Sequence, residues 1–247
     1  MFGIIGGSGL VKLAALEAPR RQVMRTPYGE PSGAVTFGKL AGTDVVFVAR
    51  HGYGHTIAPH EINYRANIWA LKELGVQGIF ALATVGGIRA DLTPGTLVVP
   101  HQIIDYTHSR AATFFELGAS AVTHIDFTHP YTQSLRQRLL DAAGHAGESV
   151  ADGAVYACTQ GPRLETAAEI NRFERDGADI VGMTGMPEAT LAREADLPYA
   201  SLSVVINYAA GRGDSRLRIE MSQYEEVLQK SVARAARVLE FAVGAHP

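Results

Sequence analysis

Residues 78–87 read Gly-Ile-Phe-Ala-Leu-Ala-Thr-Val-Gly-Gly, and this stretch decides which fold the chain is expected to adopt. Positions 78–83 form an apolar run of strand length, which predicts a buried strand. Small residues and two adjacent glycines follow at 84–87. They would let a flat ligand or a phosphate lie against the backbone, but close packing of the strand on a helix explains them equally well. The stretch therefore predicts a buried strand with a candidate ligand loop at its end.

Short apolar segments alternate with longer amphipathic ones on both sides of this strand. Strands are predicted at residues 2–5, 34–37, 45–49, 78–83, 96–99, 153–158, 180–182 and 202–206. Helices are predicted at 61–74, 130–144, 165–175, 187–194 and 222–243. In the first helix, Glu61 would complement the helix dipole and Gly75 would lie just past the end. The alternation predicts one α/β domain over residues 1–247, with a mainly parallel or mixed sheet covered by helices on both faces.

Composition excludes several classes of protein. The 247 residues carry 22 Lys and Arg against 25 Asp and Glu, a formal net charge of −3, which argues against a nucleic-acid partner or an anionic membrane surface. A single cysteine excludes a disulfide framework and a cysteine-based zinc site. The apolar runs are too short to span a bilayer, and the first residues lack the basic region of a secretory signal. We therefore expect a cytoplasmic globular protein.

Two loops that follow predicted strands are suited to an anion. The first is the Gly-Gly-Ser-Gly run at 6–9, which an ordinary turn also explains. The second is Arg-His-Gly-Tyr-Gly-His at 50–55, where the arginine offers a planar fork of donors to phosphate. Ligands of open α/β sheets bind beyond the ends of the strands. Together the two loops predict one phosphate-type ligand, which explains the second loop better than a metal held by His51 and His55.

Three further side chains are candidates for binding a heterocyclic base and its sugar. Glu165 could accept a ring N–H, or it could be a favourable charge near a helix start. Met183 could face a ligand or fill the core. Asn207 ends a predicted strand, where its amide could meet a heterocycle edge or form an Asx turn.

Taken together, these segments resemble the trimeric purine nucleoside phosphorylase and methylthioadenosine phosphorylase family. The resemblance runs over nearly the whole chain and is most specific at residues 50–55, 159–163 and 183–188. It implies a single α/β domain with a central mixed sheet, and transfer of the ribosyl group of a purine nucleoside to inorganic phosphate. No metal and no cofactor are expected. The implied assembly is a homotrimer, possibly a dimer of trimers.

The resemblance also implies roles for individual residues. Ser8, Arg50, His51, Thr84 and Thr184 would bind phosphate. The substrate would be bound by Val85, Gly86, Met183, Met221, Tyr224 and His124, with Met183 against the ribose and His124 reaching the 5′ end of the substrate across the trimer interface. Asn207 and Glu165 would bind the purine and act in catalysis.

Two departures from the family pattern concern the substrate. Methylthioadenosine phosphorylases read the 6-amino purine with two aspartates in an Asp-Tyr-Asp run, which here is Asn207-Tyr208-Ala209. The pair Asn207 and Glu165 instead resembles the residues with which 6-oxopurine enzymes hold hypoxanthine or guanine. Tyr224 stands where those enzymes have a histidine for the 5′-hydroxyl, and with Met221 it favours an apolar 5′-methylthio group. Packing of the last helix explains these two residues nearly as well.

These departures predict cleavage of 5′-methylthioinosine by phosphate to hypoxanthine and 5-methylthioribose 1-phosphate. Inosine/guanosine phosphorylase and methylthioadenosine phosphorylase are the alternatives within the family. A nucleoside hydrolase would use water in place of phosphate, and a non-catalytic nucleoside-binding protein would keep the pocket without turnover.

Overall fold

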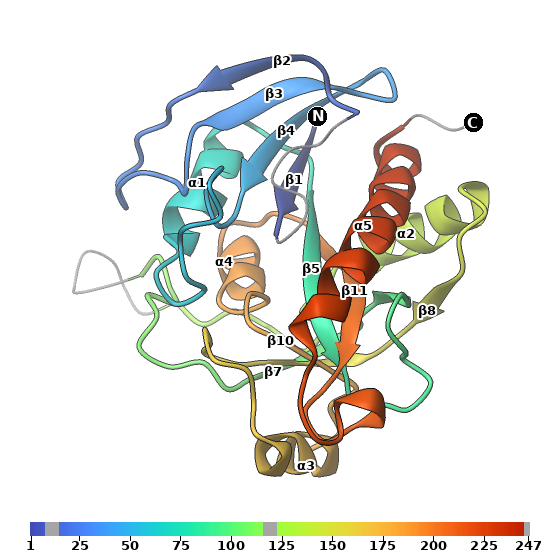
Figure 1. Ribbon diagram of the computed structural model, residues 1–247. Helices are drawn as coiled ribbons and strands as arrows, with labels where there is room; N and C mark the ends of the chain where they lie inside the picture. Colours follow the sequence, from blue (N-terminus) through green and yellow to red (C-terminus); the bar gives the residue numbers. More distant parts are fainter. Residues whose placement is uncertain (8–14, 116–122, 245–247) are drawn as a thin grey trace.

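The computed structural model describes residues 1–7, 15–115 and 123–244, and these residues form a single α/β domain around one mixed sheet (Figure 1). The strands of the described chain are β1 Phe2–Gly6, β2 Glu17–Gln22, β3 Val35–Leu40, β4 Thr43–Ala49, β5 Ile79–Gly87, β6 Leu97–Val99, β7 Gln102–Asp105, β8 Val150–Asp152, β9 Val155–Cys158, β10 Ile180–Gly182 and β11 Tyr199–Tyr208. Its helices are α1 Tyr64–Glu73, α2 Gln133–His145, α3 Ala167–Arg175, α4 Glu188–Glu194 and α5 Met221–Val243, with a short 3-10 helix at Gly213–Ser215.

The predicted strands and helices all occur, with shifted ends, and the structure adds β2, β7 and β8. Five of the six residues of β2 are exposed, so its sequence carries no apolar pattern, and it is a strand because it pairs with β3 at the sheet edge. The predicted strand 153–158 begins only at Val155, since Gly153 adopts a φ of +91°. The predicted role of Glu61 was wrong: α1 begins at Tyr64, and the Asn63 side chain caps it by accepting from the backbone of Ala66.

Strand β5 is the centre of the sheet. It pairs in parallel with β1 through residues 79–81 and with β11 along its length, while Gly86 and Gly87 pair antiparallel with β10. Gly86 therefore lies opposite Val181 of β10 on one side and opposite Asn207 of β11 on the other. The sheet divides at this point, because β10 and β11 lie on either side of the last residues of β5.

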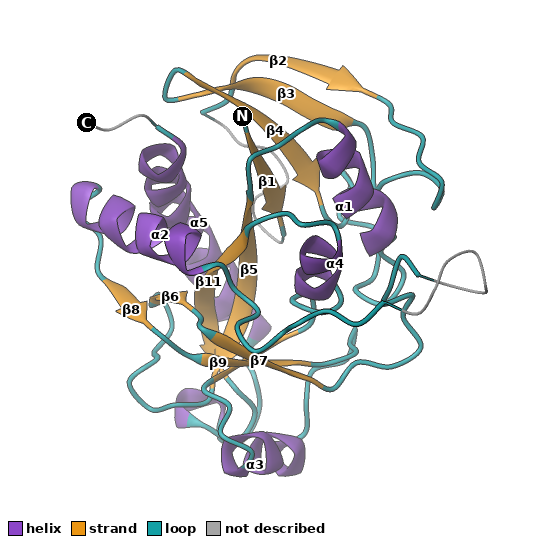
Figure 2. Ribbon diagram, turned by 180° about the vertical axis from the view of Figure 1, so that it is seen from behind, coloured by secondary structure: helices purple, strands orange, loops and turns teal. Residues whose placement is uncertain are grey.

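Helices cover both faces of the strands around β5. Helices α2 and α5 share one buried core with β1 and β4, through side chains such as Leu139 and Leu239. Helices α1 and α4 lie on the opposite face, where Ile68 and Leu191 belong to a second core (Figure 2). Helix α3 lies apart from both pairs and packs against β9 and β10. Among the described helices, none is both long and apolar enough to cross a membrane.

Candidate functional site

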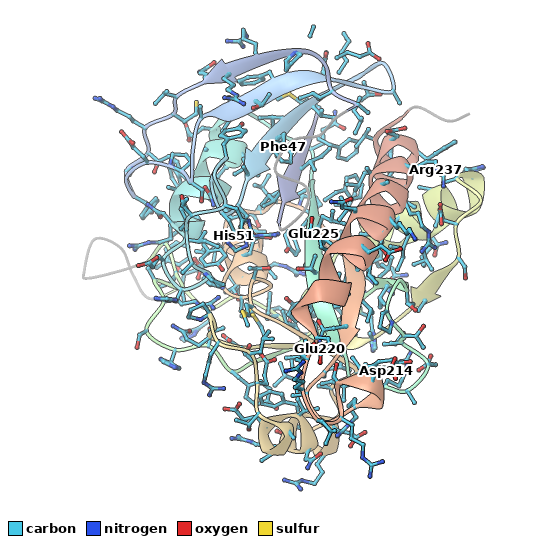
Figure 3. All side chains as sticks on the ribbon, viewed as in Figure 1. Phe47, His51, Asp214, Glu220, Glu225 and Arg237 are labelled. Carbon is cyan, nitrogen blue, oxygen red and sulfur yellow. The ribbon has the colours of Figure 1, made fainter. Side chains whose placement is uncertain are left out.

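The C-terminal ends of β1, β4, β5, β10 and β11 surround a cavity of about 470 Å³. Figure 3 shows His51, just after β4, toward the middle of the molecule, while Arg237 lies on the outer side of α5. The cavity is lined by the following residues that the sequence predicts as site residues: Arg50, His51, Thr84, Val85, Gly86, Glu165, Met183, Thr184 and Asn207. The fold thus brings together side chains that lie far apart in the sequence.

The structure does not place the remaining predicted residues in this cavity. His124 is exposed and does not line it. Ser8 lies outside the described residues, although its neighbour Gly7 is part of the cavity wall. Met221 and Tyr224 are in the first turn of α5, but their side chains lie outside the described part of the chain. The apolar 5′ site therefore stays a prediction.

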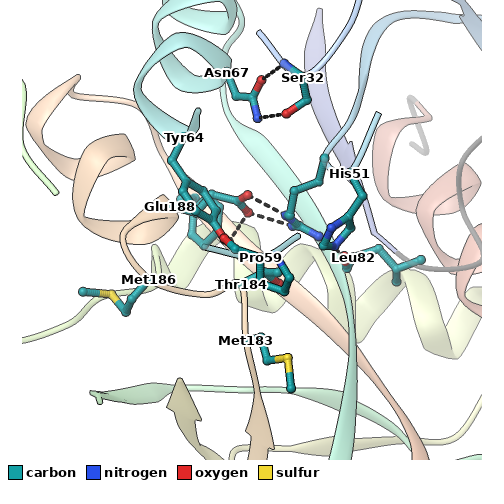
Figure 4. Close-up of polar contacts among 12 residues, drawn as sticks. Ser32, His51, Pro59, Tyr64, Asn67, Leu82, Met183, Thr184, Met186 and Glu188 are labelled. Atoms are coloured by element: carbon teal, nitrogen blue, oxygen red, sulfur yellow. Dashed lines mark hydrogen bonds and ion pairs between the residues drawn. The ribbon is translucent and has the colours of Figure 1, made fainter. Parts of the chain in front are cut away.

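Arg50 forms a buried ion pair with Glu188, the first residue of α4. Its Nε donates to Oε2 at 2.7 Å and its Nη2 to Oε1 at 2.8 Å, and both side chains are 1% exposed. The Tyr199 hydroxyl donates to Oε1 at 2.8 Å. Figure 4 shows the hydrogen bonds that meet at the Glu188 carboxylate. Burial would lower the pKa of Arg50, but the charge of Glu188 and its hydrogen bonds outweigh it and raise the pKa. The guanidinium is therefore held charged beside the cavity.

The ion pair leaves part of the Arg50 fork for a ligand. The third internal bond runs from Nη1 to the Leu82 carbonyl at 2.8 Å, so these contacts use three of the five N–H donors of a guanidinium. Gly7 lies so close that a Cβ there would come within 2.8 Å of Nη1. A glycine at the end of β1 therefore keeps the approach to this guanidinium open.

His51 lines the cavity as a neutral acceptor. Burial, together with the nearby Arg50 and His55, lowers the pKa of His51 to about 4, although its bond to Ile57 opposes the shift. Its Nδ1 donates to the Ile57 carbonyl at 2.8 Å. In the neutral ring the proton is on Nδ1, so Nε2 carries the lone pair. A ligand group bonded to Nε2 must supply a hydrogen, as the P–OH of a protonated phosphate does.

Glu165 does not cap α3. The capping box of that helix consists of Thr166 and Glu169, whose side chain accepts from the Thr166 backbone. Glu165 instead lines the cavity, and its Oε1 accepts from the Thr159 hydroxyl at 2.6 Å. Burial raises the pKa of Glu165, while the Thr159 bond opposes the shift. Of the two interpretations of this residue, the structure favours the cavity carboxylate.

Asn207 reaches the cavity because of an irregularity in β11. The register with β5 shifts between Val205 and Asn207, which places Asn207 opposite Gly86. Its Nδ2 donates to the Tyr208 carbonyl at 2.6 Å. The backbone N–H of Ala209 donates to Gly87, so Asn207 does not form the alternative Asx turn.

The paired glycines are the last two residues of β5, so the prediction of a loop after residue 83 was wrong. A Cβ on Gly87 would come within 2.1 Å of the Leu92 carbonyl oxygen, and one on Gly86 within 3.2 Å of Val181. Close packing therefore explains both glycines, but against a loop and β10 and not against a helix as the sequence suggested. Gly86 also lines the cavity, as the ligand explanation expects.

Sequence reasoning missed Glu188, Tyr199 and Thr159 as parts of this site. Glu188 and Thr159 stand in two of the three stretches that resemble the family most, and this resemblance was the available signal. Tyr199 carries no local signal, because only the fold brings it to Glu188. In the described ranges no group of three or more His, Cys, Asp or Glu could hold a metal ion.

Replacing Glu188 by glutamine is expected to destabilise the fold. The variant leaves the buried charge of Arg50 uncompensated, which typically costs about 3–5 kcal/mol. Urea unfolding at neutral pH measures the loss. The matched control Tyr199→Phe removes one hydrogen bond to the same carboxylate and should cost only about 1 kcal/mol. A Glu188→Gln protein as stable as Tyr199→Phe would contradict this role of the ion pair.

His51 is expected to make stability depend on pH. Its pKa in the folded chain is about 4, against an ordinary value of 6.5, so between these values the unfolded chain binds the proton and the folded chain does not. Stability is therefore lost as pH falls from 6.5 toward 4, by about 2 kcal/mol between pH 8 and pH 5. Urea unfolding of wild type, His51→Gln and the exposed-site control His124→Gln at both pH values tests this. Equal losses in all three proteins would refute the assignment.

Comparison with known proteins identifies the family. The sequence pattern of the phosphorylase superfamily matches residues 1–243. A protein of Pseudomonas syringae pathovar tomato named probable S-methyl-5′-thioinosine phosphorylase is 52% identical over 243 residues, which cover 97% of this chain and 98% of the relative. The 6-oxopurine nucleoside phosphorylase of Pyrococcus furiosus is 46% identical over 234 residues, 93% of this chain and 86% of that one. Methylthioadenosine phosphorylase from Schistosoma mansoni in complex with adenine has a TM-score of 0.93 at 33% identity, covering 98% of this chain and 90% of that chain. The chain therefore belongs to the phosphorylase superfamily.

Proposed function

We propose that this protein cleaves the N-glycosidic bond of 5′-methylthioinosine with phosphate, releasing hypoxanthine and 5-methylthioribose 1-phosphate. The observation that carries the proposal is the single cavity in which Arg50 and His51 lie together with Asn207 and Glu165. The first pair suits phosphate, and the second suits a purine that carries an oxygen at C6. Relatives at about 50% identity named for this substrate support the same reading.

The donors and acceptors of the cavity match the two ligands. Arg50 offers charged N–H groups to phosphate, and the neutral His51 accepts its P–OH. Glu165 accepts the N1–H of a 6-oxopurine, a proton that an adenine ring lacks. One N–H of Asn207 is engaged by Tyr208, which leaves the second to donate to the base.

The chemistry follows from these placements. As the bond between C1′ and the purine nitrogen breaks, positive charge develops on the sugar and negative charge on the leaving base. Phosphate beneath the ring stabilises the cation, and one of its oxygens forms the new bond to C1′. Asn207 donates to the purine as negative charge builds at N7 and O6. The base leaves with the electron pair of the broken bond and takes up one proton, which balances the P–OH proton that phosphate gives up on becoming the sugar phosphate ester. Inorganic phosphate is thus the co-substrate, and no other cofactor takes part in this scheme.

Inosine or guanosine is the second candidate substrate. The 6-oxopurine nucleoside phosphorylase of Pyrococcus furiosus, 46% identical to this chain, favours it. Inosine has the same base as 5′-methylthioinosine and differs from it only at the 5′ position, and guanosine also carries an oxygen at C6. At the 5′ position, Met221 and Tyr224 would provide an apolar slot for the methylthio group, and His124 would reach the 5′ end from a neighbouring copy in a homotrimer, which we propose as the assembly.

Release of free base from 5′-methylthioinosine, inosine and methylthioadenosine, each with and without phosphate, tests the proposal. We expect phosphate-dependent hypoxanthine release, fastest from 5′-methylthioinosine, because only this nucleoside combines the oxygen at C6 with an apolar 5′ group. Faster cleavage of inosine would keep the base assignment and reject the apolar 5′ slot. Faster release of adenine from methylthioadenosine would reject the base assignment, and release without phosphate would indicate a hydrolase.

Replacing Asn207 by alanine is expected to lower kcat by about 100- to 1000-fold, the usual effect of removing one donor aimed at developing negative charge. Steady-state rates with 5′-methylthioinosine at saturating phosphate measure the loss. A companion variant, Asn207→Asp with Ala209→Asp, restores the two carboxylates of the family's 6-amino purine pattern and should shift preference toward methylthioadenosine. Near-wild-type turnover of Asn207→Ala would remove this residue from the mechanism.

A further inference from the structure

Arg110 lies outside the cavity, yet it is hydrogen-bonded to the loop that carries Glu165. It belongs to the segment after β7, for which the sequence shows no clear pattern. Its Nη2 donates to the carbonyl oxygens of Thr159 at 3.1 Å and Gln160 at 2.8 Å, and its Nε donates to the Gln160 side chain at 3.2 Å. Thr159 in turn donates to Glu165. The guanidinium is therefore hydrogen-bonded to the loop of residues 159–165, here called the base-side loop, without lining the cavity itself.

The same guanidinium is also hydrogen-bonded to the loop between β10 and α4, residues 183–187, here called the phosphate-side loop. Its Nη1 donates to the carbonyl oxygens of Met183 at 2.8 Å and Met186 at 2.5 Å. Met183 and Thr184, in this loop, line the cavity on the side assigned to the sugar and phosphate. One side chain thus bonds to backbone oxygens of two loops that leave the neighbouring strands β9 and β10 and both line the cavity.

A third wall of the cavity is connected through Tyr64. Nη1 of Arg110 also donates to the Tyr64 hydroxyl at 3.2 Å, and that hydroxyl donates to the Pro59 carbonyl at 2.9 Å. Pro59 lines the cavity. The loops also touch directly, since a Cβ on Gly161 would come within 2.5 Å of the Met183 sulfur and 3.4 Å of Pro59. Small shifts of one loop would therefore be felt by the others.

We propose that Arg110 is a positioning residue that holds the base-side and phosphate-side loops at a fixed separation. It contacts neither ligand, because it does not line the cavity. Its six acceptors are uncharged oxygens on three segments, and they lie around a planar fork of five N–H groups. A lysine ammonium is a compact point charge and cannot reach both loops in this way. The role in turnover rests on the proposed function, whereas the connection between the loops does not.

The kinetic test compares Arg110→Met and Arg110→Lys with Arg136→Met. Arg136 is a matched control: its guanidinium is buried and bonds to the Val99 and Pro100 carbonyls, away from the cavity. Because misplaced reacting groups lose rate steeply, Arg110→Met should lower kcat by roughly 10- to 100-fold. Both KM values should change less than about threefold. Arg110→Lys should lie between Arg110→Met and wild type, and Arg136→Met should lower Tm while leaving kcat unchanged below its transition.

An arm that does not depend on activity is hydrogen exchange of the intact protein, followed in peptides that cover residues 159–166 and 182–188. Arg110→Met should speed exchange in both peptides together, and Arg136→Met in neither. The proposal is overturned if Arg110→Met keeps kcat within twofold of wild type, if Arg136→Met loses kcat equally, or if exchange in the two peptides is unchanged. Should wild type show no phosphate-dependent base release, the proposed function fails, and the exchange result still decides whether Arg110 holds the loops.

Discussion

The buried pair of Arg50 and Glu188 is the constraint on which the rest of the site depends. Both side chains are 1% exposed, so separating them would leave an uncompensated charge in the interior. The end of β4 and the start of α4 must therefore stay together, and Tyr199 ties β11 to the same carboxylate. Around this pair the ends of the other strands enclose the cavity. An interaction that stabilises the fold thus also keeps a charged arginine in the cavity wall.

The two sides of the cavity differ in the charged and polar groups that line them. On one side is a cation whose charge is matched by Glu188 but which still has N–H groups to offer, next to a histidine that burial keeps neutral. On the other side, Glu165 has a raised pKa and a hydroxyl partner in Thr159. A doubly charged anion and a polar, uncharged base suit these two sides respectively. Arg110 is proposed to hold the base-side and phosphate-side loops at a fixed separation.

Residues whose burial follows from a local pattern were predictable. The apolar segments around β1, β4 and β10 became strands close to their predicted ends, because a run of buried side chains is visible without knowing its partners, whereas β5 continues past its predicted end at residue 83 to Gly87. Strand β2 was not predictable from the sequence, since its exposed side chains carry no apolar pattern and only pairing with β3 makes it a strand. The start of α1 was also misplaced: the Asn63 side chain caps the first turn, and the helix begins after it and not at Glu61.

By itself the sequence determined the alternation of strands and helices, and it placed residue types suited to phosphate and a 6-oxopurine at the ends of those strands. Local composition carries that information, because hydrophobic periodicity and glycine-rich turns act over a few residues. Only the tertiary structure decided that Glu165 lines the cavity, and that a register shift in β11 sets Asn207 opposite Gly86. It alone brought Glu188 to Arg50 and Arg110 to two loops, since these contacts join residues 49 to 138 positions apart. Such contacts depend on how the sheet divides around β5, which no short stretch of sequence encodes.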